Sequence, residues 1–128
     1  MNHLEGHAGT FTEMVRALPK IELHRHLEGS LRFETLRELA RVHGLNLPPT
    51  AQLREMVQIG PNEPLTFGNF LSKFSTLRLF YRSPEIISRI TQEAIADAAA
   101  DNVRYLELRF TPAALSKVQD FPLAEVMD

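Results

Sequence analysis

Two short segments with a period-two pattern of apolar and polar residues constrain the fold of this chain more than any other feature. The first, Lys20–His26, alternates Ile21 and Leu23 with charged and imidazole side chains, and the second covers Val103–Phe110. Such alternation predicts β-strands. The residues between them have helical patterns, and a helical crossover makes consecutive strands parallel neighbours in one sheet. The order of elements therefore predicts an α/β fold.

Helices are expected between the two strands wherever apolar residues recur at helical spacing. Gly44 stands where a helix ends, and Ser83 stands at an N-cap position before Pro84. The expected ranges are 33–43, 50–58 with Thr50 as the N-cap, 67–80 and 84–100, and the tail after Pro112 can begin another helix.

Two parallel strands cannot by themselves form a sheet that is buried on both faces. We therefore expect residues 18–128 to be the N-terminal segment of a single domain, a larger barrel or sheet that is incomplete in this chain. A (β/α)8 TIM-type barrel takes about 250 residues. Residues 1–17 are expected to form an arm that becomes weakly helical at Phe11. Open strand edges and uncovered apolar helix faces predict that the segment self-associates.

Composition excludes several classes of function. The chain has 128 residues and a net charge of −2, without the basic block that binds nucleic acid. It has no cysteine, which excludes disulfides, thiolate metal sites and cysteine nucleophiles. No apolar run reaches the roughly 20 residues of a membrane helix, and the N-terminus lacks a signal-peptide pattern. We expect a cytoplasmic protein that contacts neither membranes nor nucleic acid.

His24 and His26 are the candidate metal ligands. Two residues apart on a strand, they point to the same side with Cα atoms roughly 7 Å apart. They stand at the C-terminal end of the strand, where barrel enzymes build their sites. The alternative is a pair of partly exposed histidines near a turn. Their position before an acid and a glycine favours a site for one divalent ion.

Glu28 stands two residues after His26, so a continued strand would place its side chain on the same side as the two histidines. A glutamate at this position can be a metal ligand, a general base or a hydrogen-bond acceptor for substrate, or it can be a solvated acid in a loop. We favour substrate contact, because a third ligand from so short a segment would strain the coordination geometry. The stripe of Phe67, Phe70 and Phe74 is interpreted first as helix core. Its alternative is an apolar lid over a flat heteroaromatic ligand.

The second strand also has a polar face. Tyr105, Glu107 and Arg109 alternate with Leu106 and Leu108, which are expected to pack on helices. The polar face then looks inward, where a buried acid and arginine must pair. We expect Glu107 and Arg109 to form a structural pair rather than to act in catalysis.

The segment Leu18–Leu31, LPKIELHRHLEGSL, closely resembles the adenosine deaminase family of metal-dependent barrel hydrolases. Residues Phe70–Phe74 resemble the family's substrate-gate helix, and Asn102–Pro112 resembles its second strand. The resemblance implies that His24 and His26 are two ligands of a Zn²⁺ ion. It also implies that the remaining ligands and the glutamate that protonates the purine lie on later strands.

The reaction implied by the resemblance is hydrolytic deamination. Water activated by zinc attacks C6 of an adenine-type ring, ammonia leaves and a hypoxanthine-type product forms. The partner is then a small-molecule purine, held by Glu28 and by the gate residues Phe67, Phe70 and Phe74. No catalytic residue is expected within this segment, so the 128-residue polypeptide alone should not turn over substrate.

Three alternatives remain open. Many adenosine deaminases have Asp where Glu28 stands, and Glu there resembles branches that act on adenine, modified adenylates or other adenine-bearing metabolites. The reaction could also differ, if the chain belongs to another His-x-His barrel hydrolase that cleaves a ring amide or phosphoester. Finally, the chain could be a non-catalytic deaminase-like fragment that acts through self-association. The gate-like helix and the second strand argue against a different reaction.

Overall fold

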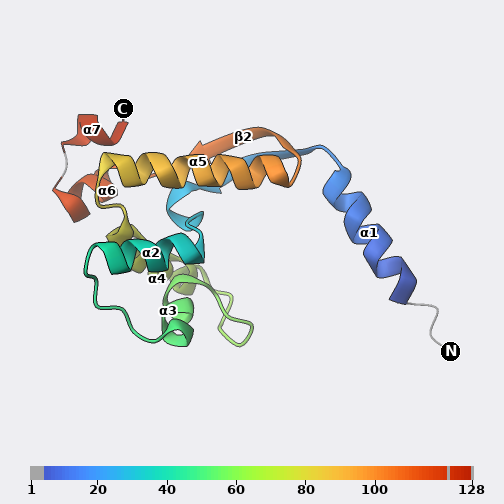
Figure 1. The fold of residues 1–128 in the computed structure, drawn as a ribbon, viewed down its shortest axis with the longest axis horizontal. Helices are drawn as coiled ribbons and strands as arrows, with labels where there is room; N and C mark the ends of the chain where they lie inside the picture. Colours follow the sequence, from blue (N-terminus) through green and yellow to red (C-terminus); the bar gives the residue numbers. More distant parts are fainter. Residues whose placement is uncertain (1–4, 121, 128) are drawn as a thin grey trace.

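A computed structural model describes residues 5–120 and 122–127 of the chain (Figure 1). Its strands are β1 (Lys20–His26) and β2 (Val103–Arg109), and the 3₁₀ helices η1 (Leu27–Gly29) and η2 (Arg78–Phe80) follow β1 and α4. The α-helices are α1 (Glu5–Ala17), α2 (Phe33–Val42), α3 (Thr50–Val57), α4 (Phe67–Leu77), α5 (Pro84–Ala100), α6 (Pro112–Gln119) and α7 (Leu123–Met127). The order of strand, helices and strand is the one expected from the sequence pattern.

The strands β1 and β2 are hydrogen-bonded neighbours and run parallel, which confirms the predicted α/β class. The register pairs Ile21 with Tyr105 near the start of the strands and His26 with Arg109 at their end. The carboxyl ends of both strands therefore meet at one edge of the sheet. Side chains that follow either strand are brought together at this edge.

A β-bulge interrupts the regular alternation of β1. The register shifts between Glu22 and Arg25, where β1 carries one extra residue relative to β2. The backbone N–H of His24 lies in the bulge and donates a hydrogen bond to Glu22 Oε1 at 3.2 Å. Because of the extra residue, Ile21 and His26 lie on the same open face of the sheet. The simple alternation that we predicted for this strand, with these two residues on opposite faces, is therefore wrong.

The other face of the sheet is covered by α5, which lies along the strands (Figure 1). This helix begins as expected: Ser83 is the N-cap, its side chain accepts a hydrogen bond from the backbone N–H of Ile86 at 3.3 Å, and Pro84 is the first helical residue. Its inward stripe is Ile86, Ile90, Ala94 and Ala98, all of which are buried. The sequence predicts these four residues and Ile87 as the inward stripe, and Ile87 is half-buried against the core.

The hydrophobic core lies among α2, α5, η2 and the end of the sheet. Its largest fully buried apolar side chains are Tyr81, Phe80, Leu36, Leu53, Ile90 and Leu115. The hydroxyl of Tyr81 is the polar exception, and it donates a 2.7 Å hydrogen bond to the backbone carbonyl of Leu27. Burial also raises the pKa of Tyr81, so the hydroxyl keeps its proton. This bond ties the loop after α4 to the turn that follows β1.

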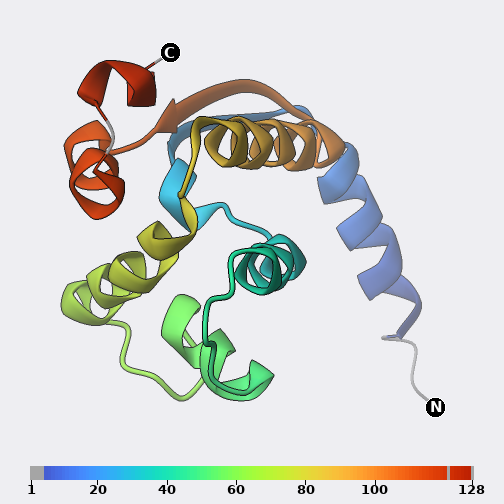
Figure 2. The ribbon, with the colours of Figure 1, turned by 60° about the vertical axis from the view of Figure 1, so that its left-hand side comes forward.

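Helix α1 stands away from the rest of the molecule in both ribbon views (Figures 1 and 2). It begins at Glu5, earlier than the weak helix that we expected from Phe11, while residues 1–4 of the expected arm lie outside the described residues. Its end is anchored by polar contacts, since Asn102 Nδ2 donates to the carbonyl of Ala17 at 2.6 Å. The division into an arm and a barrel segment stays a prediction.

Several helix boundaries differ from those expected, and α2 and α3 each end one residue early, at Val42 and Val57. Pro49 occupies the N-cap position of α3, so Thr50 is the first helical residue instead of the cap. Proline fixes φ and favours an extended entry into a helix, which explains why the boundary shifts by one residue. Helix α4 ends at Leu77 and continues as η2 rather than as an α-helix to Phe80. Among the described residues, none of the helices combines the length and apolarity needed to cross a bilayer.

We predict that Tyr81→Phe lowers the free energy of unfolding by about 1–3 kcal/mol, because the carbonyl of Leu27 loses its hydrogen bond in a buried place. Urea denaturation followed by circular dichroism measures this change. The matched control is Tyr105→Phe, at a position that is 54% exposed, where we expect a change of at most about 0.5 kcal/mol. Equal effects of the two substitutions would contradict the prediction.

Candidate active site

The side chains of His24 and His26 converge at the carboxyl end of β1. Their Nε2 atoms lie 3.0 Å apart, and the ring centroids are separated by 4.9 Å. His24 is exposed and His26 is half-buried, so the pair is accessible from the open face of the sheet. At this distance the two rings form a hydrogen bond in which the tautomers decide the donor and the acceptor. The prediction that the two rings share one side of the strand is confirmed.

The arrangement of the two rings suits a shared metal ion. Two nitrogens bound to one zinc ion at about 2.0–2.1 Å lie roughly 3.0–3.5 Å apart, which is the spacing of these Nε2 atoms. The described residues contain no group of three or more His, Cys, Asp or Glu side chains arranged to hold a metal ion. This part of the chain can therefore supply two ligands of a tetrahedral site.

Glu28 lies in η1, directly after the second histidine, and its side chain is fully buried. Its Oε1 accepts a 2.8 Å hydrogen bond from the backbone N–H of Thr111, which follows β2. The guanidinium Nε of Arg78 lies 3.9 Å from the same oxygen. The other carboxylate oxygen, Oε2, is buried without a hydrogen-bond partner among the described residues. Glu28 is therefore a buried acid whose side chain is fixed by a hydrogen bond, and it is not a solvated loop acid.

The aromatic side chains of α4 extend from this edge of the sheet outwards. Phe74 is buried and meets His26 edge-on, with ring centroids 5.8 Å apart, and Phe70 meets Phe74 at 5.1 Å. Phe70 and Phe67 are 41% and 74% exposed. The interpretation of all three as helix core is wrong for these two, because they extend beyond the elements that bury Phe74. The stripe instead presents aromatic surface next to the histidines.

The polar face of β2 borders the same open side. An oxygen of Glu107 lies 3.8 Å from the guanidinium of Arg109, and the hydroxyl of Tyr105 donates to Glu107 at 3.1 Å. This hydrogen bond raises the pKa of Tyr105, because it is lost when the phenol ionises in the presence of the carboxylate. The expected ion pair between Glu107 and Arg109 forms, but both side chains are about half-exposed and not buried.

Two residues of the site were not found by sequence reasoning. Thr111 contributes only its backbone N–H, which no side-chain pattern can reveal, and Arg78 follows α4 at the point where the helix tightens. The single available signal is the position of Thr111 directly after the second strand. Residues at the carboxyl ends of parallel strands meet at one edge, so this position could have been named.

Comparison with known proteins agrees with the fold. The family model described as adenosine deaminase matches residues 19–128. A probable adenosine deaminase of Dictyostelium discoideum is 38% identical over 118 residues, which cover 91% of this chain and 15% of that protein. An adenosine deaminase of Vibrio vulnificus is 37% identical over 113 residues, covering 87% of this chain and 34% of the relative.

Solved structures give the same result. The apo N6-methyl-AMP deaminase from Arabidopsis thaliana matches with a TM-score of 0.66 and 34% identity, over 90% of this chain and 32% of that one. The Arabidopsis ADAL complexed with GMP matches with a TM-score of 0.68 at the same identity, over 90% of this chain and 33% of that one. The two strands and their helices thus match one part of a (β/α)8 barrel, as predicted.

The fold, with two histidines paired at a strand end, matches part of a (β/α)8 barrel. The chain belongs to the adenosine deaminase family. It spans between 15% and 34% of the length of the curated relatives that it matches.

Proposed function

We propose that this chain forms the amino-terminal part of the active site of a longer, zinc-dependent enzyme that hydrolytically deaminates an adenine-type purine. The observation that carries the proposal is the convergence of two imidazole nitrogens, 3.0 Å apart, at the carboxyl end of a barrel strand. The relatives named as adenosine deaminases and as an N6-methyl-AMP deaminase support the reaction class. The reaction belongs to purine metabolism, and a cytoplasmic location stays a prediction.

In this proposal His24 and His26 hold zinc through their Nε2 atoms. When bound, zinc lowers the pKa of water in its coordination sphere toward about 7 and so makes hydroxide available at neutral pH. Both imidazoles must be neutral to ligate, because a protonated ring has no free lone pair. The remaining ligands and the group that protonates the purine would come from the strands that complete the barrel. Residues 1–128 alone are therefore expected to be inactive.

Glu28 is proposed to contact the substrate. Its Oε1 is occupied by the backbone N–H of Thr111, whereas Oε2 has no hydrogen-bond partner among the described residues. A buried acceptor without a partner costs free energy, and a donor on a substrate, such as a hydroxyl or a ring N–H, would satisfy it. The hydrogen bond to Thr111 fixes the carboxylate in one orientation before substrate arrives.

The aromatic stripe of α4 is proposed to form the apolar wall of the purine site. Phe74 already contacts His26, and the exposed rings of Phe70 and Phe67 continue the same surface. Flat heteroaromatic ligands bind in pockets lined by such side chains, where they gain apolar contact and lose water. The wall would bring the purine close to the paired histidines while excluding solvent.

A direct assay of the complete enzyme tests the proposed function. The zinc-loaded enzyme is incubated with adenosine, adenine, AMP and N6-methyl-AMP, and the released amine and the ultraviolet spectrum of the purine are followed. We expect deamination of at least one of them. Full zinc loading without release of amine from any of these compounds would contradict the proposal, and the ranking of rates would identify the substrate branch.

We predict that His24→Ala in the complete enzyme lowers bound zinc and the deamination rate together, because removing one of four ligands opens the coordination sphere. Metal analysis after dialysis and steady-state assay measure the two quantities. The control is His43→Ala, since His43 is exposed at the end of α2, away from the strand end. A His24→Ala enzyme with full zinc and an unchanged rate would overturn the assignment.

We predict that Glu28→Gln raises KM about tenfold or more while the zinc content stays normal. Glutamine is nearly isosteric and can still accept from Thr111, but it loses the charge that strengthens a hydrogen bond to substrate, an effect of about 1–3 kcal/mol. Glu28→Ala should raise KM further. Loss of zinc from Glu28→Gln would show that this residue is a metal ligand.

We also propose that the 128-residue polypeptide self-associates when it is produced by itself. The open face of its sheet carries Ile21, Leu23 and Tyr105, which are 68%, 56% and 54% exposed. Apolar surface of this kind beside an unpaired strand edge favours contact with a second chain.

Light scattering on the isolated polypeptide measures this association. We expect oligomers, and we expect Ile21→Lys to shift them toward monomer because a charge on a strand face disfavours stacking. Leu65→Lys is the matched control, since Leu65 is 89% exposed in a loop outside the sheet. A monodisperse unmodified monomer would contradict the proposal.

A further inference from the structure

An ion pair connects α4 to the segment that precedes it. The ammonium of Lys73, on α4, donates to Glu63 Oε2 at 2.6 Å and also to the backbone carbonyl of Glu55 on α3. Glu63 in turn accepts from Asn69 Nδ2 at 2.8 Å and from the backbone N–H of Gly60 at 3.2 Å. The Glu63 carboxylate therefore accepts hydrogen bonds from the loop and from two successive turns of α4.

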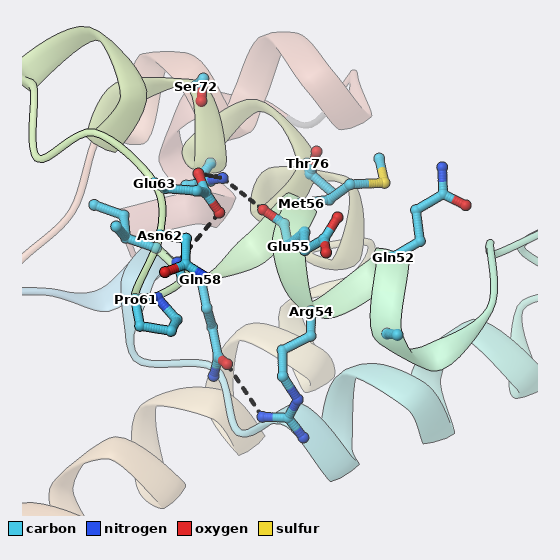
Figure 3. A pocket seen from close by; sticks show the side chains of 14 residues that line it. Gln52, Arg54, Glu55, Met56, Gln58, Pro61, Asn62, Glu63, Ser72 and Thr76 are labelled. Carbon is cyan, nitrogen blue, oxygen red and sulfur yellow. Dashed lines mark hydrogen bonds and ion pairs between the residues drawn. The ribbon is translucent and has the colours of Figure 1, made fainter.

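These groups line a pocket of about 940 Å³ between α3, the loop that follows it and α4 (Figure 3). The pocket is lined on α4 by Ser72, Lys73 and Thr76, whereas Phe70 and Phe74 point from a different face of the helix. Neither histidine lines it. The ion pair thus acts on the side of α4 away from the candidate metal site.

The carboxylate of Glu63 stays ionised over the range of pH in which an enzyme of this kind would work. Lys73 is 9% exposed, so its charge requires a partner. The hydrogen bonds from Lys73, then Asn69 and Gly60, lower the pKa of Glu63 to about 2. Protonation of Glu63 therefore does not break the pair above about pH 3.

Apolar packing holds the amino-terminal half of α4 only weakly. Phe67, Phe70 and Leu71 are 74%, 41% and 48% exposed, and the buried residues of the helix are Lys73, Phe74 and Leu77, all in its second half. The side chain of Thr66 caps the first turn, and Glu63 binds both Asn69 and Lys73. Polar contacts, rather than a buried stripe, set where this half of the helix lies.

We infer that Glu63 is a positioning residue: through Lys73 and Asn69 it fixes α4 so that Phe70 and Phe74 stand beside His26 as the wall of the purine site. A helix moves as a rigid body over two turns, so holding one face fixes the other. The inference rests on the proposed function for the identity of the ligand. Glu63 then affects the affinity for substrate without contacting the substrate.

The test compares Glu63→Gln, Lys73→Met and the double variant in the complete zinc-loaded enzyme. We expect each single change to raise KM about fivefold to tenfold, with kcat within about twofold and zinc content unchanged, because the wall binds ground state and transition state alike. The double variant should be no worse than either single one, since both break the same pair. Calorimetric titration with the purine product should show the same loss of affinity.

Glu55→Gln is the matched control, because its carboxylate lines the same pocket but only its backbone carbonyl binds Lys73. It should leave KM unchanged. If Glu63→Gln does not fold, Asn69→Ala removes one of its donors at a half-buried position and should raise KM by a smaller factor.

The outcomes separate this inference from the proposed function. Variants with a lower melting temperature but an unchanged KM and unchanged product affinity would show that the pair is merely structural, and would overturn the inference. A wild-type enzyme that deaminates none of the purines would overturn the proposed function instead. In that case, the affinity of the variants for a purine would still decide the role of Glu63.

Discussion

The parallel pairing of β1 with β2 is the constraint on which the rest of the site depends. Parallel strands bring their carboxyl ends to one edge, and here that edge places the turn after β1 against the residue that follows β2. The hydrogen bond from the Thr111 backbone to Glu28 closes this junction. Without the pairing, neither the paired histidines nor the buried carboxylate would have a fixed position relative to α4.

Charged side chains are buried both at this edge and on another face of α4, and each case is resolved differently. Glu28 is satisfied on one oxygen by a backbone N–H and has Arg78 nearby, which leaves the other oxygen without a partner. Lys73 is satisfied by a carboxylate and a carbonyl. Since a buried charge without compensation is costly, a half-satisfied carboxylate beside the paired histidines is the feature that most directly indicates a binding site.

The sequence was sufficient to predict the parts of the fold that follow from local pattern. The order and approximate extent of the strands and helices, the Ser83 cap and the convergence of His24 and His26 depend on periodicity and on single residue types. The exposure of Phe67 and Phe70 could not be predicted, because a helical stripe looks the same whether another element covers it or not. Contacts through the backbone, such as that of Thr111, leave no side-chain signal at all.

The bulge in β1 has a consequence for the way in which the site tolerates change in chain length. It reverses which parity of residue faces the open side, so the imidazoles point there and Arg25 points toward α5. Removing Leu23 from the bulge would restore regular alternation and still leave Arg25 opposite Leu108 and His26 opposite Arg109, so both imidazoles would keep their face. A strand of the present length that paired without the bulge would instead turn its end by one position and present Arg25 on the open face in place of the imidazoles. A substitution in this stretch changes one side chain, whereas a slip of register exchanges the whole set of side chains on the open face.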